Sequence, residues 1–284
     1  MTETIGNPLS WGVGALRGAG RGIEAVTAEI ASHDTAVPRV RRIDYEDLRD
    51  CLRLGWQDFL ACRSDVAALC LLYPIIGIAM AYVALKGELL PLAFPIVSGF
   101  ALVGPAAAVG LYEMSRLRER GQEPSWADAF AVAGSPSFGA IFALAVMLGV
   151  TFLVWLLVAN GIYVITLGPD APVSLGSFLT EALTTPAGWA MTIVGIAVGG
   201  LFATLVLATS VVSFPLLIDR HVGLPVAVVT SIRVAEENPG PIAVWGLIVA
   251  VLLALGSLPA FLGLLVVLPV LGHATWHLYR RAVV

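Results

Sequence analysis

Residues 141–159 read IFALAVMLGVTFLVWLLVA, a run without a single charged side chain. A helix needs roughly 20 apolar residues to cross the hydrocarbon core of a bilayer. With its neighbours, from about 138 to 165, this run is long enough to do so. In the whole chain, 58% of the 284 residues are hydrophobic and 13% are charged, whereas a soluble domain carries about 25% charged residues. The sequence therefore indicates an all-α membrane protein with several spans.

Six segments are predicted to cross the membrane. They are 66–85, 90–112, 138–165, 189–218, 241–256 and 259–278. The last two come from one apolar block that is too long for a single helix. The stretch LGSLPAFLG (255–263) interrupts this block, and Pro259 cannot continue a helical hydrogen-bond ladder. We expect a tight hairpin there.

The basic residues predict the orientation of these spans. With six spans, all the arginines fall on one side of the membrane and Lys86, the only lysine, falls on the other. Basic loop residues are enriched on the cytoplasmic side. Both termini are therefore predicted to be cytoplasmic. The residues expected to fix this orientation after the second and sixth spans are Arg116, Arg118, Arg120, Arg280 and Arg281.

The cytoplasmic segments suggest three pseudo-repeats, each an amphipathic interfacial helix followed by a transmembrane hairpin. Such stretches begin near residues 44, 125 and 224. In the first, Leu48, Leu52, Trp56 and Phe59 are expected to share one apolar face. Asp44 with Asp47, and Ser125 with Asp128, have the spacing of N-terminal capping pairs. These helices are expected to lie flat at the lipid headgroups or to dock on a partner subunit.

The chain is predicted to divide into two parts. Residues 1–40 lack the apolar core of a signal peptide and are interpreted as a mobile cytoplasmic arm. Residues 41–284 are predicted to form the six-helix transmembrane domain. The three cysteines show no CxxC pair, which argues against a disulfide framework or a zinc site.

The middles of the predicted spans contain no ionisable residue. Transporters and pumps usually retain such residues at bilayer depth for a task. Glycines are frequent instead, and Gly195, Gly199 and Gly200 predict close packing of the fourth span against another helix. Broken helices at prolines such as Pro95 and Pro105 keep a transport route open as an alternative.

His273 and His277 are the ligand-like pair of the chain, because residues i and i+4 share one face of a helix. One metal ion could be bound by both imidazoles, with Glu113 and His221 as further candidate ligands. Two histidines on one helical turn lie on the same side of any haem beside them, so His273 and His277 cannot be its two opposed axial ligands. The other reading is that both histidines are aromatic residues at the membrane–water border, beside Trp276 and Tyr279.

Soluble catalytic motifs are absent from the sequence. It contains no P-loop, no GxSxG, no HExxH and no dinucleotide fingerprint. The net charge of −4 gives no indication of a nucleic-acid partner. The chain is therefore expected not to be an enzyme, and no cofactor is predicted.

Four stretches carry a resemblance to a known family. They are GFALVGPAAAVGLYEMSRLRERGQEPSWADAF (99–130), SVVSFPLLIDR (210–220), SIRVAEENPGP (231–241) and LPVLGHATWHLYRR (268–281). They resemble bacterial integral membrane proteins that share a domain of unknown function, DUF2189, over about residues 40–283. The resemblance implies a multi-pass protein of the bacterial inner membrane. It supplies no established activity.

Some members of that family carry the label of a cytochrome c oxidase subunit. A catalytic haem–copper subunit needs about twelve spans and several intramembrane histidines, so this chain is not expected to be one. The leading interpretation is a non-catalytic accessory, scaffold or assembly protein of a membrane complex, with a respiratory complex as one candidate and with lipid and other membrane subunits as partners. The alternatives are a transporter or channel for a small or lipophilic substrate, and a metal-binding protein that uses His273 and His277.

Overall fold

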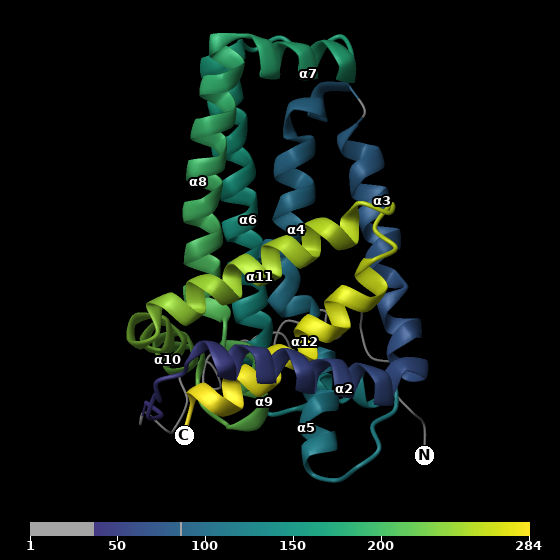
Figure 1. Cartoon of the computed structure of the whole chain (residues 1–284), viewed down its shortest axis with the longest axis vertical. Coiled ribbons are helices and arrows are strands. Elements are labelled where there is room, and N and C mark those ends of the chain that lie inside the picture. The colour runs from purple at the N-terminus through teal and green to yellow at the C-terminus, as the bar shows by residue number, and fades with distance from the viewer. Residues whose placement is uncertain (1–36, 86) are drawn as a thin grey trace, which may run out of the picture.

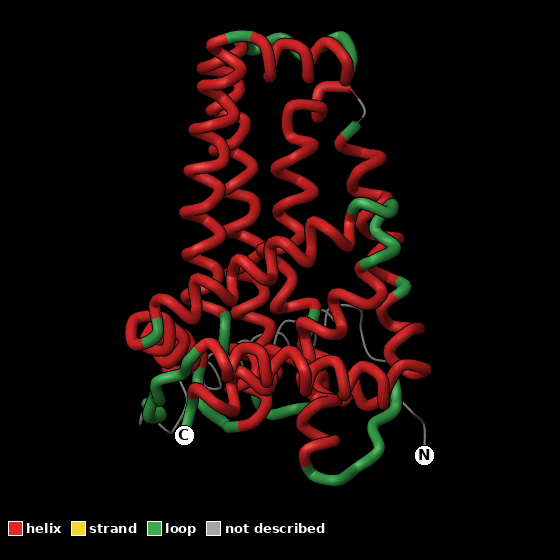
Figure 2. The backbone as a smooth tube through the Cα atoms, viewed as in Figure 1, coloured by secondary structure: helices red, strands yellow, loops and turns green. Residues whose placement is uncertain are grey.

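The computed structural model describes residues 37–85 and 87–284, without the side chains of residues 63–70, 87, 88 and 100. Most of the arm predicted for residues 1–40 therefore lies outside the described residues. The described part is all-helical (Figure 2), apart from its loops and one isolated antiparallel bridge between Val40 and Val283. The predicted all-α fold class is confirmed.

The helices follow one another through short connections. In chain order they are α2 (Tyr45–Cys70), α3 (Leu72–Ala84), η1 (Gly87–Leu92), α4 (Ala93–Ala107), α5 (Val109–Glu119), η2 (Asp128–Gly134), α6 (Phe138–Leu167), α7 (Leu175–Thr184), α8 (Pro186–Ser210), α9 (Ser213–Asp219), α10 (Leu224–Glu237), α11 (Pro239–Ser257) and α12 (Leu264–Ala282). In Figure 1, α6 and α8 stand side by side and are joined at their far end by α7, while α11 crosses the bundle obliquely.

Three helical segments among the described residues are long and apolar enough to cross a membrane. They are Phe138–Thr166, Pro186–Asp219 and Pro239–Ser257. A fourth results if Leu89–Gly99 and Ala101–Ala107, bent by 40° to one another, count as one span. These segments correspond to four of the six predicted spans, and the count of six is not confirmed.

The first and last predicted spans are not among these segments. Helix α3 alone has 13 residues, a length of about 20 Å against the roughly 30 Å of a bilayer core; residues 66–70 of the first predicted span belong to the end of α2 and their side chains are not described, so this span stays a prediction. Helix α12 is apolar only in its first half, and its second half is buried among charged helices at one end of the molecule. The hairpin predicted between α11 and α12 is confirmed, because Ala260 and Phe261 take φ angles of 50° and 63° in the intervening turn.

The predicted repeat is present only as an order of elements. Helices α2, η2 and α10 each precede a helix pair: α3 with α4, α6 with α8, and α11 with α12. The leading helices have 26, 7 and 14 residues. Because the units differ this much, the threefold architecture stays a prediction. The capping pair of Asp44 and Asp47 is confirmed, since the two bond reciprocally. The Ser125 amide and hydroxyl both donate to Asp128, but the N-cap of η2 is Ala127, which has no side-chain capping bond, so Ser125 does not cap this helix.

The hydrophobic core extends along α6, where Leu144, Leu148 and Trp155 are buried, but much of it lies at one end of the molecule. We call this end the polar-end layer; it consists of α2, α5, α9, α10 and residues 273–282 of α12. The large side chains of Met114, Phe214, Trp276 and Tyr279 are fully buried in it. By contrast, Leu157 of α6 is 72% exposed. Lipid tails are as apolar as leucine, so helices in a bilayer gain little by burying such side chains against each other.

Helices α2 and α12 form the closest packing in this layer. A Cβ atom added to Gly55 would lie 2.6 Å from the backbone nitrogen of Ala274 and 2.7 Å from the carbonyl oxygen of Val270. The face of α2 that meets α12 carries Cys51 and Asp58, both buried. The two helices can approach this closely only because position 55 has no side chain.

The predicted apolar face of α2 is therefore partly wrong. Leu48 is buried as expected, but Trp56 is 45% exposed. The small residues Cys51 and Gly55 occupy the contact, because a close helix crossing selects for small side chains rather than for the most apolar ones. Cys51 and Cys62 are both buried on this helix.

Replacement of Gly55 by alanine is expected to destabilise the protein by about 1–3 kcal/mol, because the added methyl group meets backbone atoms that cannot move aside. The thermal unfolding midpoint in detergent measures this effect. Gly195→Ala is the matched control, because a Cβ atom there meets open space. Equal midpoints for Gly55→Ala and Gly195→Ala would contradict the close crossing of α2 and α12.

Candidate functional site

A cluster of polar side chains is buried between α2, α5 and α12. We call it the Asp58 cluster; its members are Asp58, Ser115, Arg118, His273 and His277. The Oδ2 atom of Asp58 accepts hydrogen bonds from Ser115 Oγ at 2.8 Å and from His277 Nε2 at 2.9 Å. Its Oδ1 atom accepts one from Arg118 Nε at 2.9 Å. One carboxylate therefore joins three helices.

His273 is the most deeply buried member, with no exposed surface. Its Nδ1 atom lies 2.8 Å from Ser115 Oγ. Because the single hydroxyl hydrogen of Ser115 goes to Asp58, the Nδ1 atom of His273 must carry the proton and donate to Ser115. The Nε2 atom then holds an unshared electron pair, and it has no hydrogen-bond partner among the described residues.

The protonation states of the cluster follow from burial and charge. Burial lowers the pKa of His273 to about 4, although Asp58 opposes the shift. His273 is therefore neutral at neutral pH. Burial tends to raise the pKa of Asp58, but the hydrogen bonds from His277 and Ser115 outweigh it and hold that pKa below its usual value. Asp58 is ionised and faces the guanidinium of Arg118.

The order Asp58, Ser115, His273 does not have the connectivity of a nucleophilic serine site. In such a site the serine hydroxyl donates to the lone pair of the histidine, which then accepts its proton. Here the hydroxyl donates to the carboxylate and accepts from the imidazole. The cluster therefore acts as a structural junction of α2, α5 and α12.

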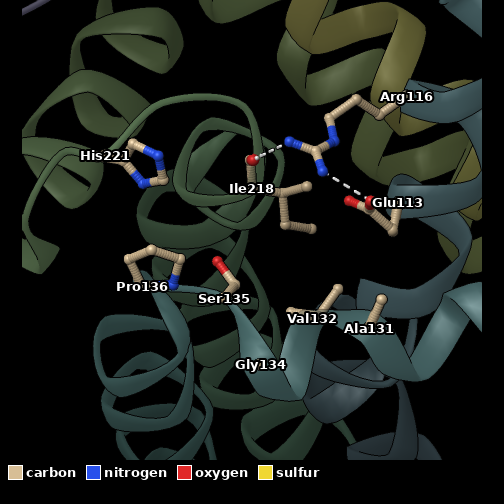
Figure 3. A pocket seen from close by; sticks show the side chains of 9 residues that line it. All are labelled: Glu113, Arg116, Ala131, Val132, Gly134, Ser135, Pro136, Ile218 and His221. Carbon is tan, nitrogen blue, oxygen red and sulfur yellow. Dashed lines mark hydrogen bonds and ion pairs between the residues drawn. The ribbon is translucent and has the colours of Figure 1, made fainter.

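A second polar place is a hollow of about 310 Å³ between α5, η2 and the turn after α9 (Figure 3), which we call the Arg116 hollow. Arg116 donates from Nη2 to Glu113 Oε1 at 2.6 Å and from Nη1 to the carbonyl oxygen of Ile218 at 2.9 Å. Ser135 and His221 lie across the hollow from this pair. A cation and an anion thus stand side by side at one wall.

An apolar groove of about 270 Å³ lies on the other side of η2, and we call it the η2 groove. Ala106 and Gly110 form its small-residue floor, while Phe130, Phe138 and Phe142 line it with exposed rings. The rings of Phe138 and Phe142 are stacked at 6.2 Å. Val132 lines both the groove and the Arg116 hollow, so the two adjoin at this residue.

The four candidate metal ligands are divided between these two places. His273 and His277 belong to the Asp58 cluster, whereas Glu113 and His221 line the Arg116 hollow. Within the described residues there is no group of three or more His, Cys, Asp or Glu that could hold a metal ion. His273 is completely buried between α2, α5 and α12, and its reading as an aromatic residue at the membrane–water border stays a prediction.

Three of the five predicted orientation anchors form ion pairs with neighbouring helices. Arg118 pairs with Asp58, Arg280 with Glu119 and Asp219, and Arg281 with Asp47 and Asp50. Arg116 pairs with Glu113, and Arg120 is exposed at the end of α5. Their role as anchors stays a prediction, but four of them also connect helices within the polar-end layer.

The predicted packing glycines behave differently from one another. A Cβ atom on Gly199 would lie 3.1 Å from the Trp155 ring of α6, so this glycine allows α6 and α8 to approach closely. Positions 195 and 200 face open space. The GxxxG pattern therefore marks one contact within the chain rather than two.

Sequence reasoning missed Asp58 and Ser115. A usable signal was present: Leu48, Cys51, Gly55 and Asp58 recur at three- or four-residue spacing along α2. A carboxylate in such a stripe needs a partner when the stripe is buried. Ser115 carried no comparable signal, because its role depends on α5 meeting α12.

Comparison with known proteins agrees with this architecture. Residues 93–219 match the family described as predicted integral membrane protein (DUF2189). The match confirms the resemblance to this family over α4 to α9, whereas the stretches 231–241 and 268–281 lie outside it. Neither the curated proteins nor the solved structures contain a match to the chain.

The buried neutral state of His273 makes stability depend on pH. Its pKa is about 4 in the folded protein and 6.5 for an unperturbed histidine, so only the unfolded chain takes up a proton between these values. The contribution of neutral His273 to the free energy of unfolding is then fully present above pH 6.5. As the pH falls from 6.5 toward 4, the free energy of unfolding decreases by at most about 1.4 kcal/mol per pH unit. Unfolding midpoints measured across this range should decrease on acidification, and less so in His273→Asn.

His221→Asn serves as the control for this experiment, since His221 is exposed at the rim of the Arg116 hollow. It should keep the pH dependence of the wild-type protein. The assignment of His273 as the titrating group fails if His273→Asn and the wild type lose stability in parallel.

Proposed function

We propose that the protein is a non-catalytic accessory or scaffold protein of a complex in the bacterial inner membrane. One observation carries the proposal. The described helices α4, α6, α8 and α11 contain no Asp, Glu, Lys, Arg or His, while the charged residues of the polar-end layer are largely satisfied by one another. Such a protein can offer partner subunits a rigid, ion-paired surface. Its spans offer little polar surface to which a substrate could bind.

The position of the hollows supports the accessory function over transport. The Arg116 hollow and the η2 groove both adjoin η2, at the border of the polar-end layer. A transporter instead binds its substrate near the bilayer midplane. The wide apolar faces of α6 and α11 suit contact with lipid or with apolar helices of partner subunits.

The accessory function predicts a defined complex in the native membrane. Gentle solubilisation of the tagged chain at its natural expression level should give one stable species heavier than the monomer, with the same partner subunits at fixed stoichiometry. Native electrophoresis and mass spectrometry measure this, and tagging the partner should recover this chain in return. A tagged inner-membrane protein of similar span number is the control. Migration as a lone monomer under all gentle conditions would refute the accessory function.

The charge distribution also supports a cytoplasmic polar-end layer. Among the described residues, basic side chains occur in this layer and the loops beside it, whereas the α7 end carries only the acids Asp170 and Glu181. Basic residues favour the cytoplasmic side. The bridge between Val40 and Val283 places the start of the described chain beside the C-terminus.

Reporter fusions should verify this orientation. A fluorescent protein fused after Val284 should fold and fluoresce, and alkaline phosphatase at the same position should be inactive. Both results should invert for fusions in the loop between α6 and α7. An active phosphatase after Val284 would reverse the proposed orientation.

A further inference from the structure

The Arg116 hollow and the η2 groove lie where the chain passes between the apolar and the charged part of the molecule. Helix α4 ends at Ala107, and α6 begins at Phe138; η2 lies between them in the chain, and its Val132 lines both the hollow and the groove. Helices that cross a bilayer meet the lipid headgroups at such borders. A ligand at this place has a polar and an apolar environment within reach.

The polar side offers two opposite charges to one ligand. Glu113 is 5% exposed, and the Arg116 side chain is 23% exposed. A guanidinium has five N–H donors, of which the contacts to Glu113 and Ile218 use two. Figure 3 shows the nitrogen atoms of this group and the Glu113 carboxylate at the edge of the same hollow. Arginine suits phosphate recognition because its donors match the phosphate oxygens, while a neighbouring carboxylate attracts an ammonium group.

The apolar side offers a surface for a hydrocarbon chain. Phe130, Phe138 and Phe142 are 60%, 42% and 58% exposed, and small residues deepen the groove between them. Each methylene group that leaves water contributes about 0.8 kcal/mol, but this gain is absent for a chain that leaves lipid. The groove therefore contributes shape and orientation, and the polar contacts decide whether a ligand stays.

We propose that this double site binds one zwitterionic glycerophospholipid with an ethanolamine headgroup. Arg116 binds its phosphate, Glu113 binds its ammonium group, and one acyl chain lies in the η2 groove. An anionic lipid is disfavoured, because Glu113 already neutralises Arg116. A soluble phosphate compound lacks the chain that the groove accommodates.

Native mass spectrometry of the detergent-purified full chain tests the site. The probes are dioleoylphosphatidylethanolamine, dioleoylphosphatidylglycerol, glycerophosphoethanolamine and inorganic phosphate. We expect one molecule of the phosphatidylethanolamine to remain bound after delipidation, about ten-fold more tightly than the phosphatidylglycerol. The two chain-free probes should bind at least ten-fold more weakly. Tighter binding of the phosphatidylglycerol, or equal binding of a chain-free probe, overturns the assignment.

Two variants block the site without removing a charge. Position 134 is exposed at the hollow and has open space for a Cβ atom, so Gly134→Leu fills the hollow. Ala133 is exposed at the groove, so Ala133→Phe fills the groove. Each should weaken binding about ten-fold at an unchanged unfolding midpoint. Gly149→Leu on α6 and Ala203→Phe on α8, at positions that line neither place, are the matched controls and should bind like the wild type.

Arg116→Gln tests the phosphate contact directly and should also weaken binding about ten-fold, with Arg120→Gln on the same helix as the control. If Arg116→Gln lowers the unfolding midpoint, its weaker binding could reflect lost structure, and Gly134→Leu and Ala133→Phe then test whether the lipid binds at this site. Equal lipid retention in all variants and controls would show only non-specific boundary lipid and would overturn the proposal. This outcome is independent of the partner experiment, which concerns other protein subunits.

Discussion

The rest of the polar-end layer depends on the hydrogen bonds that the Asp58 carboxylate accepts. It sits on α2, at a point where α12 approaches so closely that Gly55 has no room for a side chain. Its two oxygens accept hydrogen bonds from Ser115, Arg118 and His277, which come from α5 and α12. A buried charge is stable only when it is paired and hydrogen-bonded. The position of each of these three helices is therefore coupled to the other two.

The same layer ties together distant parts of the chain. The side chain of Asn238, between α10 and α11, accepts from the backbone of Ile43 and donates to the carbonyl oxygen of Arg41. Arg281 near the C-terminus pairs with Asp47 and Asp50 at the start of α2. These contacts give the molecule a packed, ion-paired base, and the apolar helices project from it. In lipid, where burial of apolar surface supplies little stability, this distribution of contacts is physically reasonable.

The two polar places of the protein have different chemical character. In the Asp58 cluster the polar side chains contact one another, and the neutral ring of His273 is completely buried. In the Arg116 hollow the ion pair stands at an open wall beside Ser135 and His221 (Figure 3). The first place therefore contributes to stability, and the second is the one that a ligand can reach. Neither follows from the spacing of His273 and His277, which had been the most ligand-like feature of the sequence.

The sequence by itself determined the helical fold class, the membrane setting, the hairpin at Pro259 and the capping pair of Asp44 and Asp47. These features depend on local composition and on backbone chemistry within a few residues, which a sequence displays directly. Only the tertiary structure decided that α12 ends in a buried layer, that α2 uses Gly55 and Asp58 as its contact face, and that Glu113 and His221 lie apart from His273. Those outcomes depend on which helices pack together and how closely. Contacts between residues more than a hundred positions apart in the chain determine both.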